Sequence, residues 1–288
     1  MNPQALASPE SLAEALKRQA YLADEGLAVA IFLALKLQKP LLLEGRPGVG
    51  KTEAAKAVAA VTSREVLRLQ CYEGIDASQA LYEWNYPRQL LALRQAGDSP
   101  INLYSPDFLI ERPLLKALNA PASSLLLIDE IDRSDHEFEA FLLEFLSEFQ
   151  ISIPETGTLK ASEPPLVVMT SNRTRELHDA LRRRCIYHWI PYPDPAREAD
   201  IIMMRAPDVA RSTAKAVASA VQSLRRMPLS KPPGIAEAIE WANAASLLEQ
   251  GQGWPVAFRK AIGMVVKDED DQLLVEPALD ALLQDACR

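Results

Sequence analysis

Eight consecutive residues have the types and spacing needed to bind a nucleoside triphosphate. They fit the pattern Gly-x-x-x-x-Gly-Lys-Thr and are Gly45, Arg46, Pro47, Gly48, Val49, Gly50, Lys51 and Thr52. Glycines let backbone N–H groups turn inward around phosphate oxygens, a lysine reaches the β- and γ-phosphates, and a threonine hydroxyl binds Mg²⁺. A plain Gly/Pro turn before a helix is the alternative interpretation. The spacing favours a phosphate-binding loop.

An acidic pair, Asp129 and Glu130, follows the continuously apolar run 125–128. Downstream of a phosphate loop, the first carboxylate is placed to bind Mg²⁺ together with Thr52. The second is one residue further on, and it can orient and deprotonate the water that attacks the γ-phosphate. A solvated acidic strand end is the alternative. The apolar run and the preceding loop favour the catalytic interpretation.

Two further polar groups are candidates for the same chemistry. Asn172 follows the apolar run 166–170, and its amide could contact the γ-phosphate or fix the attacking water, although Asn is also a common helix cap. Arg183 and Arg184 belong to three consecutive arginines that precede the run 186–190. A favourable interaction with a helix C-terminus is one explanation for them. The other is an arginine finger, which is worth roughly 10³–10⁵ in rate and can act on a neighbouring subunit's nucleotide.

The elements that must position these residues are short apolar strands alternating with helices. We expect strands at residues 41–44, 66–70, 124–130, 166–170 and 186–190, and helices at 11–37, 53–60 and along the Phe-rich stretch 138–149. Continuously apolar strands are typical of a parallel sheet covered on both faces. In such a sheet ligands gather at the carboxyl ends of the strands, which is where the candidate residues lie.

The chain divides into two predicted domains. Residues 1–194 form an α/β nucleotide-binding domain with an insertion near 72–113 and a hairpin near 151–160, and 195–288 form a small all-helical domain. In the helical domain we expect helices at 195–205, 208–226, 235–250, 255–267 and 276–287. Within the insertion we expect helical pieces broken by Pro87. In the Phe-rich helix we expect Glu137, Glu139, Glu144 and Glu148 to lie off the apolar face.

Composition excludes some classes of function. The 288 residues carry a net charge of −8, which argues against a general nucleic-acid binder. Three scattered cysteines show neither metal-ligand spacing nor a disulfide framework, so a cytoplasmic location is expected. The apolar stretch 27–35 is far shorter than the ~20 residues that span a bilayer, and we expect it to be the buried part of a helix.

Taken together, these motifs resemble an AAA+ ATPase, and closely the MoxR branch. The order of phosphate loop, Leu-Leu-Leu-Ile-Asp-Glu-Ile-Asp, hairpin, Thr-Ser-Asn-Arg-Thr and Leu-Arg-Arg-Arg matches over nearly the whole chain. Within that branch, residues 70–76 and 231–234 look like the CoxD type, which is encoded beside carbon-monoxide dehydrogenase genes.

This resemblance implies an AAA+ P-loop fold, with a five-stranded parallel sheet covered by helices and followed by a helical lid. It implies ATP and Mg²⁺ as cofactors, a homo-oligomeric ring, commonly a hexamer, and a partner with a von Willebrand A domain. Glu130 would be the catalytic glutamate, Asn172 the first sensor, and Arg184 the finger with Arg183 as second choice. The implied client is a metalloenzyme such as molybdenum–copper carbon-monoxide dehydrogenase.

The sequence departs from the family at one place and leaves two other functions open. Many AAA+ lids carry a second sensor arginine at a helix start, but here that helix begins at Gly234 without one, and Arg259 is the only substitute we considered. A nucleic-acid-dependent AAA+ motor remains an alternative that the acidic balance weakens. A phosphate-loop kinase is a further alternative, and Glu130, the arginines and the helical tail argue against it.

Overall fold

The computed structural model describes residues 6–97, 100–154, 157–249 and 253–286. Two compact units are present, and each is treated by itself below. The first comprises the chain up to Gln19, Ala23–Glu44 and Thr52–Trp189, and the second comprises Ala20–Leu22, Gly45–Lys51 and the chain from Ile190 onward. Most of the phosphate loop thus clusters with the C-terminal helices. Our domain boundary at residue 194 stays a prediction.

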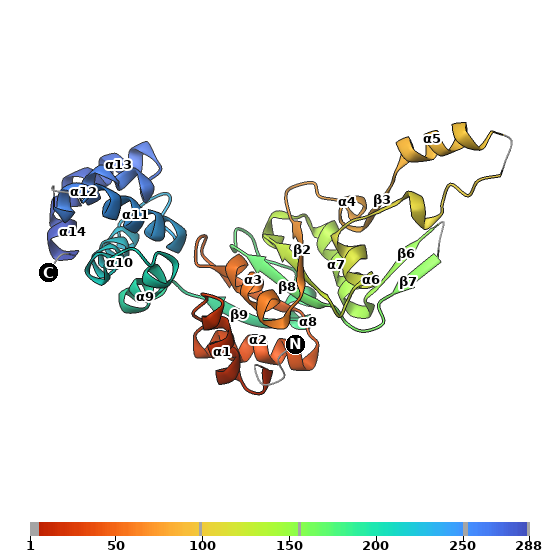
Figure 1. Ribbon diagram of the computed structural model, residues 1–288, viewed down its shortest axis with the longest axis horizontal. Coiled ribbons are helices and arrows are strands. Elements are labelled where there is room, and N and C mark those ends of the chain that lie inside the picture. Colours follow the sequence, from red (N-terminus) through yellow and green to blue (C-terminus); the bar gives the residue numbers. More distant parts are fainter. Residues whose placement is uncertain (1–5, 98–99, 155–156, 250–252, 287–288) are drawn as a thin grey trace. The chain divides into compact units, whose positions relative to one another are not determined.

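A five-stranded parallel sheet forms the centre of the first unit (Figure 1), as predicted. Its strands are β1 (Leu41–Gly45), β2 (Glu65–Gln70), β5 (Ser124–Asp129), β8 (Leu166–Ser171) and β9 (Ile186–Ile190). Their order is β2-β5-β8-β1-β9. Every residue of β5 and β8 is buried, as their apolar runs indicate. The register pairs Gln70 with Asp129, so the polar ends of β2 and β5 lie side by side.

Helices alternate with these strands along the chain, and the helix expected over 11–37 differs in the structure. They are α1 (Pro9–Arg18), α2 (Glu25–Leu37), α3 (Lys51–Thr62), α6 (Pro113–Asn119), α7 (His136–Glu148) and α8 (Asp179–Arg184). The single helix expected over 11–37 is two helices. Ala20 has a left-handed backbone (φ 55°), and the Asp24 side chain caps α2 by accepting the Leu27 N–H at 2.7 Å. None of the described helices has the length and apolar character to cross a membrane.

The insertion contains α4 (Ala77–Leu81), β3 (Tyr82–Trp84), α5 (Tyr86–Ala96) and β4 (Leu109–Glu111), with β3 and β4 antiparallel. Pro87 lies in the first turn of α5 rather than breaking a helix, because a missing N–H costs nothing there. The predicted hairpin is confirmed as β6 (Gln150–Ile153) paired with β7 (Gly157–Lys160), and the expected turn residues Glu155 and Thr156 lie outside the described residues. Figure 1 shows α5 projecting away from the central sheet.

The second unit is helical apart from its phosphate-loop segment. Its helices are α9 (Pro195–Arg205), α10 (Arg211–Arg226), α11 (Ile235–Leu248), α12 (Trp254–Lys260), α13 (Glu269–Val275) and α14 (Leu279–Ala286). Its core is built around Trp241, whose indole N–H donates to the Phe258 carbonyl at 3.1 Å. We expected one helix over 255–267, but α12 ends at Lys260 and a short 3₁₀ turn containing Gly263 follows. Helix α13 was not expected.

Candidate nucleotide site

The phosphate loop joins β1 to α3, the strand–loop–helix context that the sequence predicts. The buried Lys51 ammonium donates to the carbonyl oxygens of Gly45 at 2.8 Å and Arg46 at 2.9 Å, so the loop curves around its own lysine. Gly48 and Gly50 have φ of 76° and 93°, a region that favours glycine. The glycine pattern therefore matches a backbone that side chains rarely adopt.

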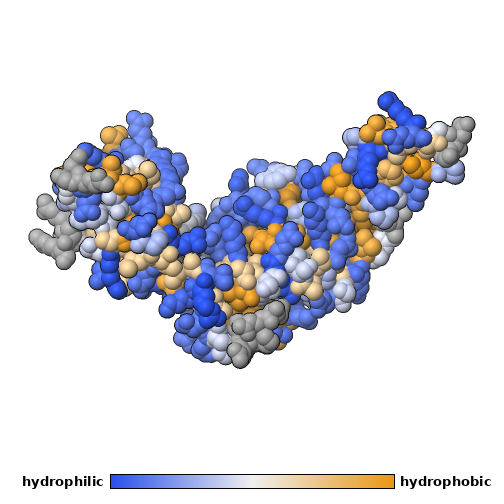
Figure 2. Space-filling view, in the orientation of Figure 1, coloured by the Kyte–Doolittle hydropathy of each residue, from blue (hydrophilic) through white to orange (hydrophobic). Residues whose placement is uncertain are grey.

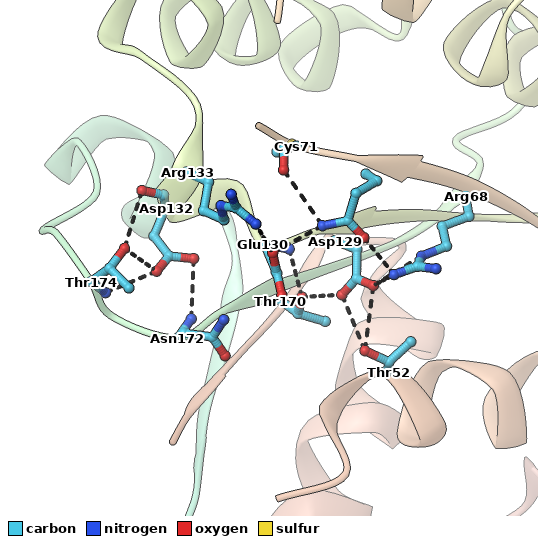
Figure 3. Close-up of polar contacts among 11 residues, drawn as sticks. Thr52, Arg68, Cys71, Asp129, Glu130, Asp132, Arg133, Thr170, Asn172 and Thr174 are labelled. Atoms are coloured by element: carbon cyan, nitrogen blue, oxygen red, sulfur yellow. Dashed lines mark hydrogen bonds and ion pairs between the residues drawn. The ribbon is translucent and has the colours of Figure 1, made fainter. Parts of the chain in front are cut away.

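Asp129 is the centre of a polar cluster at the end of β5 (Figure 3). Its buried carboxylate accepts hydrogen bonds from Thr52 Oγ1 at 3.1 Å, Thr170 Oγ1 at 2.5 Å and Arg68 Nε at 2.9 Å. The Thr52 hydroxyl and the Asp129 carboxylate supply hard oxygen atoms within reach of one another, the ligand type that Mg²⁺ prefers. The structure thus brings the two predicted magnesium ligands together.

Glu130 directly follows Asp129, and its orientation is fixed from three directions. Its backbone is left-handed (φ 55°), and its N–H donates to Thr170 Oγ1 at 2.9 Å. Its carboxylate accepts from Gln70 Nε2 at 3.0 Å and pairs with Arg133 Nη1 at 3.1 Å. The Glu130 side chain is 32% exposed, so water can reach the carboxylate while Gln70 and Arg133 hold it in place.

Asn172 lies just beyond β8, next to the Asp129 cluster in Figure 3. Its N–H donates to Asp132 Oδ1 at 3.1 Å, and the Thr174 N–H donates to Asp132 Oδ2 at 2.8 Å. Buried Asp132 thus fixes the backbone on either side of Arg173, whose φ is 58°. No hydrogen bond of the Asn172 side-chain amide is found among the described residues.

The first turn of α7 differs from the sequence-based expectation at Glu139. Glu139 does not lie off the buried face, because it is fully buried. Its carboxylate forms an ion pair with Arg175 and accepts the His178 N–H at 2.7 Å. A buried carboxylate requires such partners, and they come from the segment that links Asn172 to α8.

The predicted arginines are separate from the cluster. Arg183 and Arg184 are exposed on α8, and Arg184 Nη1 donates to the Ala180 carbonyl at 3.1 Å. The neighbouring Arg182 lies over the Tyr187 ring at 5.6 Å. Among the described residues, no hydrogen bond or ion pair joins either exposed arginine to Asp129, Glu130 or Asn172.

Several residues of the cluster were missed by sequence reasoning, namely Arg68, Gln70, Asp132, Arg133 and Thr170. The only signal was a charged residue in the middle of the β2 pattern and a polar one at its end. Their roles depend on β2 and β8 flanking β5, and strand order is not visible in a local pattern.

The start of α11 contacts the phosphate loop within the second unit. A Cβ built on Gly48 would stand 2.6 Å from the Gly234 Cα, and the Ile235 N–H donates to the Gly48 carbonyl at 2.8 Å. This is the helix start without the second sensor arginine. Arg259, the substitute considered above, instead pairs with Glu276 and Asp280.

Comparisons with known proteins give a consistent result. A family model described as AAA domain, dynein-related subfamily, matches residues 40–185. An uncharacterized protein from Staphylococcus haemolyticus is 24% identical over 276 residues, covering 92% of this chain and 98% of that protein.

Solved structures show the same fold at low identity. A candidate ATPase from Cytophaga hutchinsonii matches with a TM-score of 0.50 and 16% identity, covering 98% of this chain and 96% of that one. The RuvB Holliday junction branch migration motor of Thermotoga maritima matches with a TM-score of 0.52 and 16% identity, covering 98% and 85%.

Proposed function

The chain belongs to the AAA domain family, dynein-related subfamily, and is an ATPase; from this premise we propose that it is an oligomeric AAA+ ATPase of the MoxR type that couples Mg-ATP hydrolysis to the remodelling of a protein client. The observation that carries the proposal is the acidic pair at the end of β5. Asp129 lies within hydrogen-bond distance of the Thr52 hydroxyl, while Glu130 is held apart from it by Gln70 and Arg133. Two adjacent carboxylates thus have different partners, which suits one for metal binding and the other for proton transfer.

The chain's residues divide the work as follows in this proposal. The loop 45–51 and Thr52 bind the phosphates, Asp129 and Thr52 hold Mg²⁺, and Glu130 accepts a proton from the attacking water. Bound Mg²⁺ would neutralise charge that develops on the phosphate oxygens. Asn172 would orient the water or the γ-phosphate from the neighbouring strand end, and Asp132 keeps its backbone in place.

We assign the arginine finger to Arg184, with Arg183 as second choice. Both are exposed and make no described contact with the acidic pair of their own chain. A guanidinium in that situation can act on the nucleotide of an adjoining copy, as in a homo-oligomeric ring such as a hexamer. The site would then be complete only in the assembly.

The client and adaptor follow from the MoxR resemblance alone. We propose a protein with a von Willebrand A domain as partner and a metalloenzyme as client, with molybdenum–copper carbon-monoxide dehydrogenase as the first candidate to test. Supporting features are the CoxD-like stretches 70–76 and 231–234. The first of these contains Gln70, which contacts the proposed catalytic glutamate.

The decisive test replaces Glu130 with Gln. Glu130→Gln should keep Mg-ATP binding, because the phosphate loop and Asp129 remain, and should lose steady-state release of phosphate. Glu137→Gln is the matched control, since Glu137 is an exposed glutamate on α7. Equal turnover by Glu130→Gln and the wild type would contradict the role of Glu130.

The same variant identifies the client. Held in ATP, Glu130→Gln should retain the client and adaptor together in a pull-down, whereas Lys51→Ala should not. Strong stimulation of wild-type turnover by DNA would instead favour a nucleic-acid motor. Formation of ADP with a phosphorylated metabolite, and no free phosphate, would favour a kinase.

A further inference from the structure

Arg225, near the end of α10, forms the most buried arginine ion pair among the described residues of the second unit. Its Nη1 and Nη2 each lie 2.7 Å from one carboxylate oxygen of Glu198 on α9. The Arg225 side chain is 7% exposed and the Glu198 side chain is fully buried. A two-pronged pair of this kind fixes the orientation of the guanidinium plane as well as its position. The guanidinium group held in this way contacts two further groups, and each of them is in turn linked to the phosphate loop.

The first group is Tyr192. The Arg225 guanidinium carbon lies 4.1 Å from the centre of its ring, a stacking geometry that planar arginine favours. The Tyr192 hydroxyl in turn donates to the Pro47 carbonyl of the phosphate loop at 3.3 Å. Arg225 therefore reaches Pro47 through a single aromatic side chain.

The second group is the turn that begins α11. Arg225 Nε donates to the Pro233 carbonyl at 2.8 Å, one residue before the Gly234 that contacts Gly48. The Gly234 N–H is occupied by Glu237 Oε2 at 3.2 Å, and the Ile235 N–H by the Gly48 carbonyl at 2.8 Å. The helix start thus bonds the loop through backbone atoms, and its position depends on Pro233.

The preceding part of this turn is fixed as well. Asp271 on α13 accepts the N–H groups of Ser230 at 2.9 Å and Lys231 at 3.0 Å, and Lys231 Nζ pairs with Asp268 at 3.0 Å. The turn is therefore anchored at residues 230–231 and again at Pro233. Displacement of Pro233 cannot be absorbed by a free segment upstream, so it would be passed on to Gly234 and the loop.

We propose that Arg225 is a positioning residue for nucleotide binding: through Tyr192 to Pro47, and through Pro233 and Gly234 to Gly48, it holds the first half of the phosphate loop in the curve that receives phosphates. This inference rests on the proposed nucleotide-binding function. In this proposal the C-terminal helices hold the phosphate loop through Arg225, and no arginine of these helices needs to touch the nucleotide.

The test compares nucleotide affinity and turnover in the full chain. Arg225→Met should raise Kd for Mg-ADP and KM for ATP together, by on the order of tenfold, and change kcat little, because Thr52, Asp129 and Glu130 are untouched. Arg226→Met is the matched control on the same helix, and it should leave all three constants at wild-type values because Arg226 is exposed. A purely structural role would lower the thermal midpoint without this split between KM and kcat.

A gentler variant keeps the test decisive if Arg225→Met fails to fold. Tyr192→Phe keeps the ring beneath the guanidinium and removes only the hydroxyl, so it should raise Kd for Mg-ADP about twofold. In the double variant with Arg225→Met, Tyr192→Phe should raise Kd by less than it does alone, because both changes break the link from Arg225 through Tyr192 to Pro47. Hydrogen exchange of the amides of Gly48, Val49 and Gly50 should quicken in both variants.

Two results would overturn the inference in distinguishable ways. If wild-type protein binds Mg-ADP and neither Arg225→Met nor Tyr192→Phe changes Kd or loop exchange, the positioning role is wrong and the proposed function stands. If correctly folded wild-type protein binds no nucleotide, the proposed function fails and this inference fails with it.

Discussion

The Asp129 cluster and the contacts around Gly48 support the same chemistry by different means. In the first, polar side chains from β2, β8 and the start of α3 meet at the Asp129 carboxylate at the end of β5. In the second, glycine backbones lie close together, and the side chains that we propose hold them are Tyr192 and Arg225, the latter from a buried ion pair. We infer that the first region sets how fast the phosphate is cleaved, and the second how tightly it is held. The predictions below separate kcat from affinity for this reason.

Among the further variants below, the largest effect is expected outside both regions. Arg184→Ala should lower kcat by about 10³-fold with little change in Kd for Mg-ATP, because a finger acts on charge that develops only during transfer. Phosphate release and nucleotide binding would be measured on the same preparation.

Mixing experiments give this prediction its control. Rings that combine Arg184→Ala with Glu130→Gln subunits should recover part of the activity. Where an Arg184→Ala subunit holds the nucleotide and a Glu130→Gln subunit adjoins it, the interface has both an intact Glu130 and an intact Arg184. Full turnover by a strictly monomeric form would rule out a finger acting between subunits.

Gly48→Ala tests the second region directly. The new methyl group would stand 2.6 Å from the Gly234 Cα on a backbone with φ 76°, so the loop or α11 must move. Strain of about 1–3 kcal/mol at such a position predicts that Kd for Mg-ADP rises by roughly tenfold to a hundredfold. Gly263→Ala, which meets nothing within 4 Å, should leave Kd unchanged. Normal affinity in Gly48→Ala would remove the distinction between the regions.

Asp132→Ala tests the first region through its support. The change leaves the Asn172 and Thr174 N–H groups without their carboxylate, at a cost of about 1–3 kcal/mol in stability. We expect kcat to fall by about tenfold while Kd for Mg-ADP stays near its wild-type value. Asp132→Asn, which keeps one acceptor oxygen, should lie between the two. A rise in Kd with unchanged kcat would show that Asp132 supports nucleotide binding rather than cleavage, and the assignment of Asp132 to the first region would be wrong.

The smallest effect concerns pH and the turn before α11. Hydrogen bonds from the Ser230 N–H and its neighbours lower the pKa of Asp271 below its ordinary value, despite an opposing effect of burial. Near the ordinary aspartate pKa the native state therefore binds fewer protons than the unfolded state, so this stabilisation is present above that pH and is lost as pH falls through the lowered pKa. Amide protection at Ser230 and Lys231, taken as the exchange rate relative to that of an unstructured peptide at the same pH, should fall with acid more in wild type than in Asp271→Asn. Parallel pH profiles in the two proteins would contradict this.

The two regions also differ in how far the sequence predicts them. The phosphate loop and the strands could be identified because glycine spacing and apolar runs are local signals. Arg68 and Gln70 could not be assigned, since their contacts require β2 to lie beside β5 in one particular register. The burial of Glu139 was missed for a related reason, because its partner Arg175 is far along the chain. The link from Arg225 to Pro47 joins residues so distant in sequence that no periodicity reports it.

A single hydroxyl contacts both members of the acidic pair. The Thr170 hydroxyl donates a hydrogen bond to the Asp129 carboxylate and accepts one from the backbone N–H of Glu130. Transplanting residues 124–130 alone into another scaffold would therefore carry the carboxylates but not their alignment. Because Arg68 and Gln70 of β2 also contact the two carboxylates, the smallest unit that could be moved with its contacts includes β2, β5 and β8.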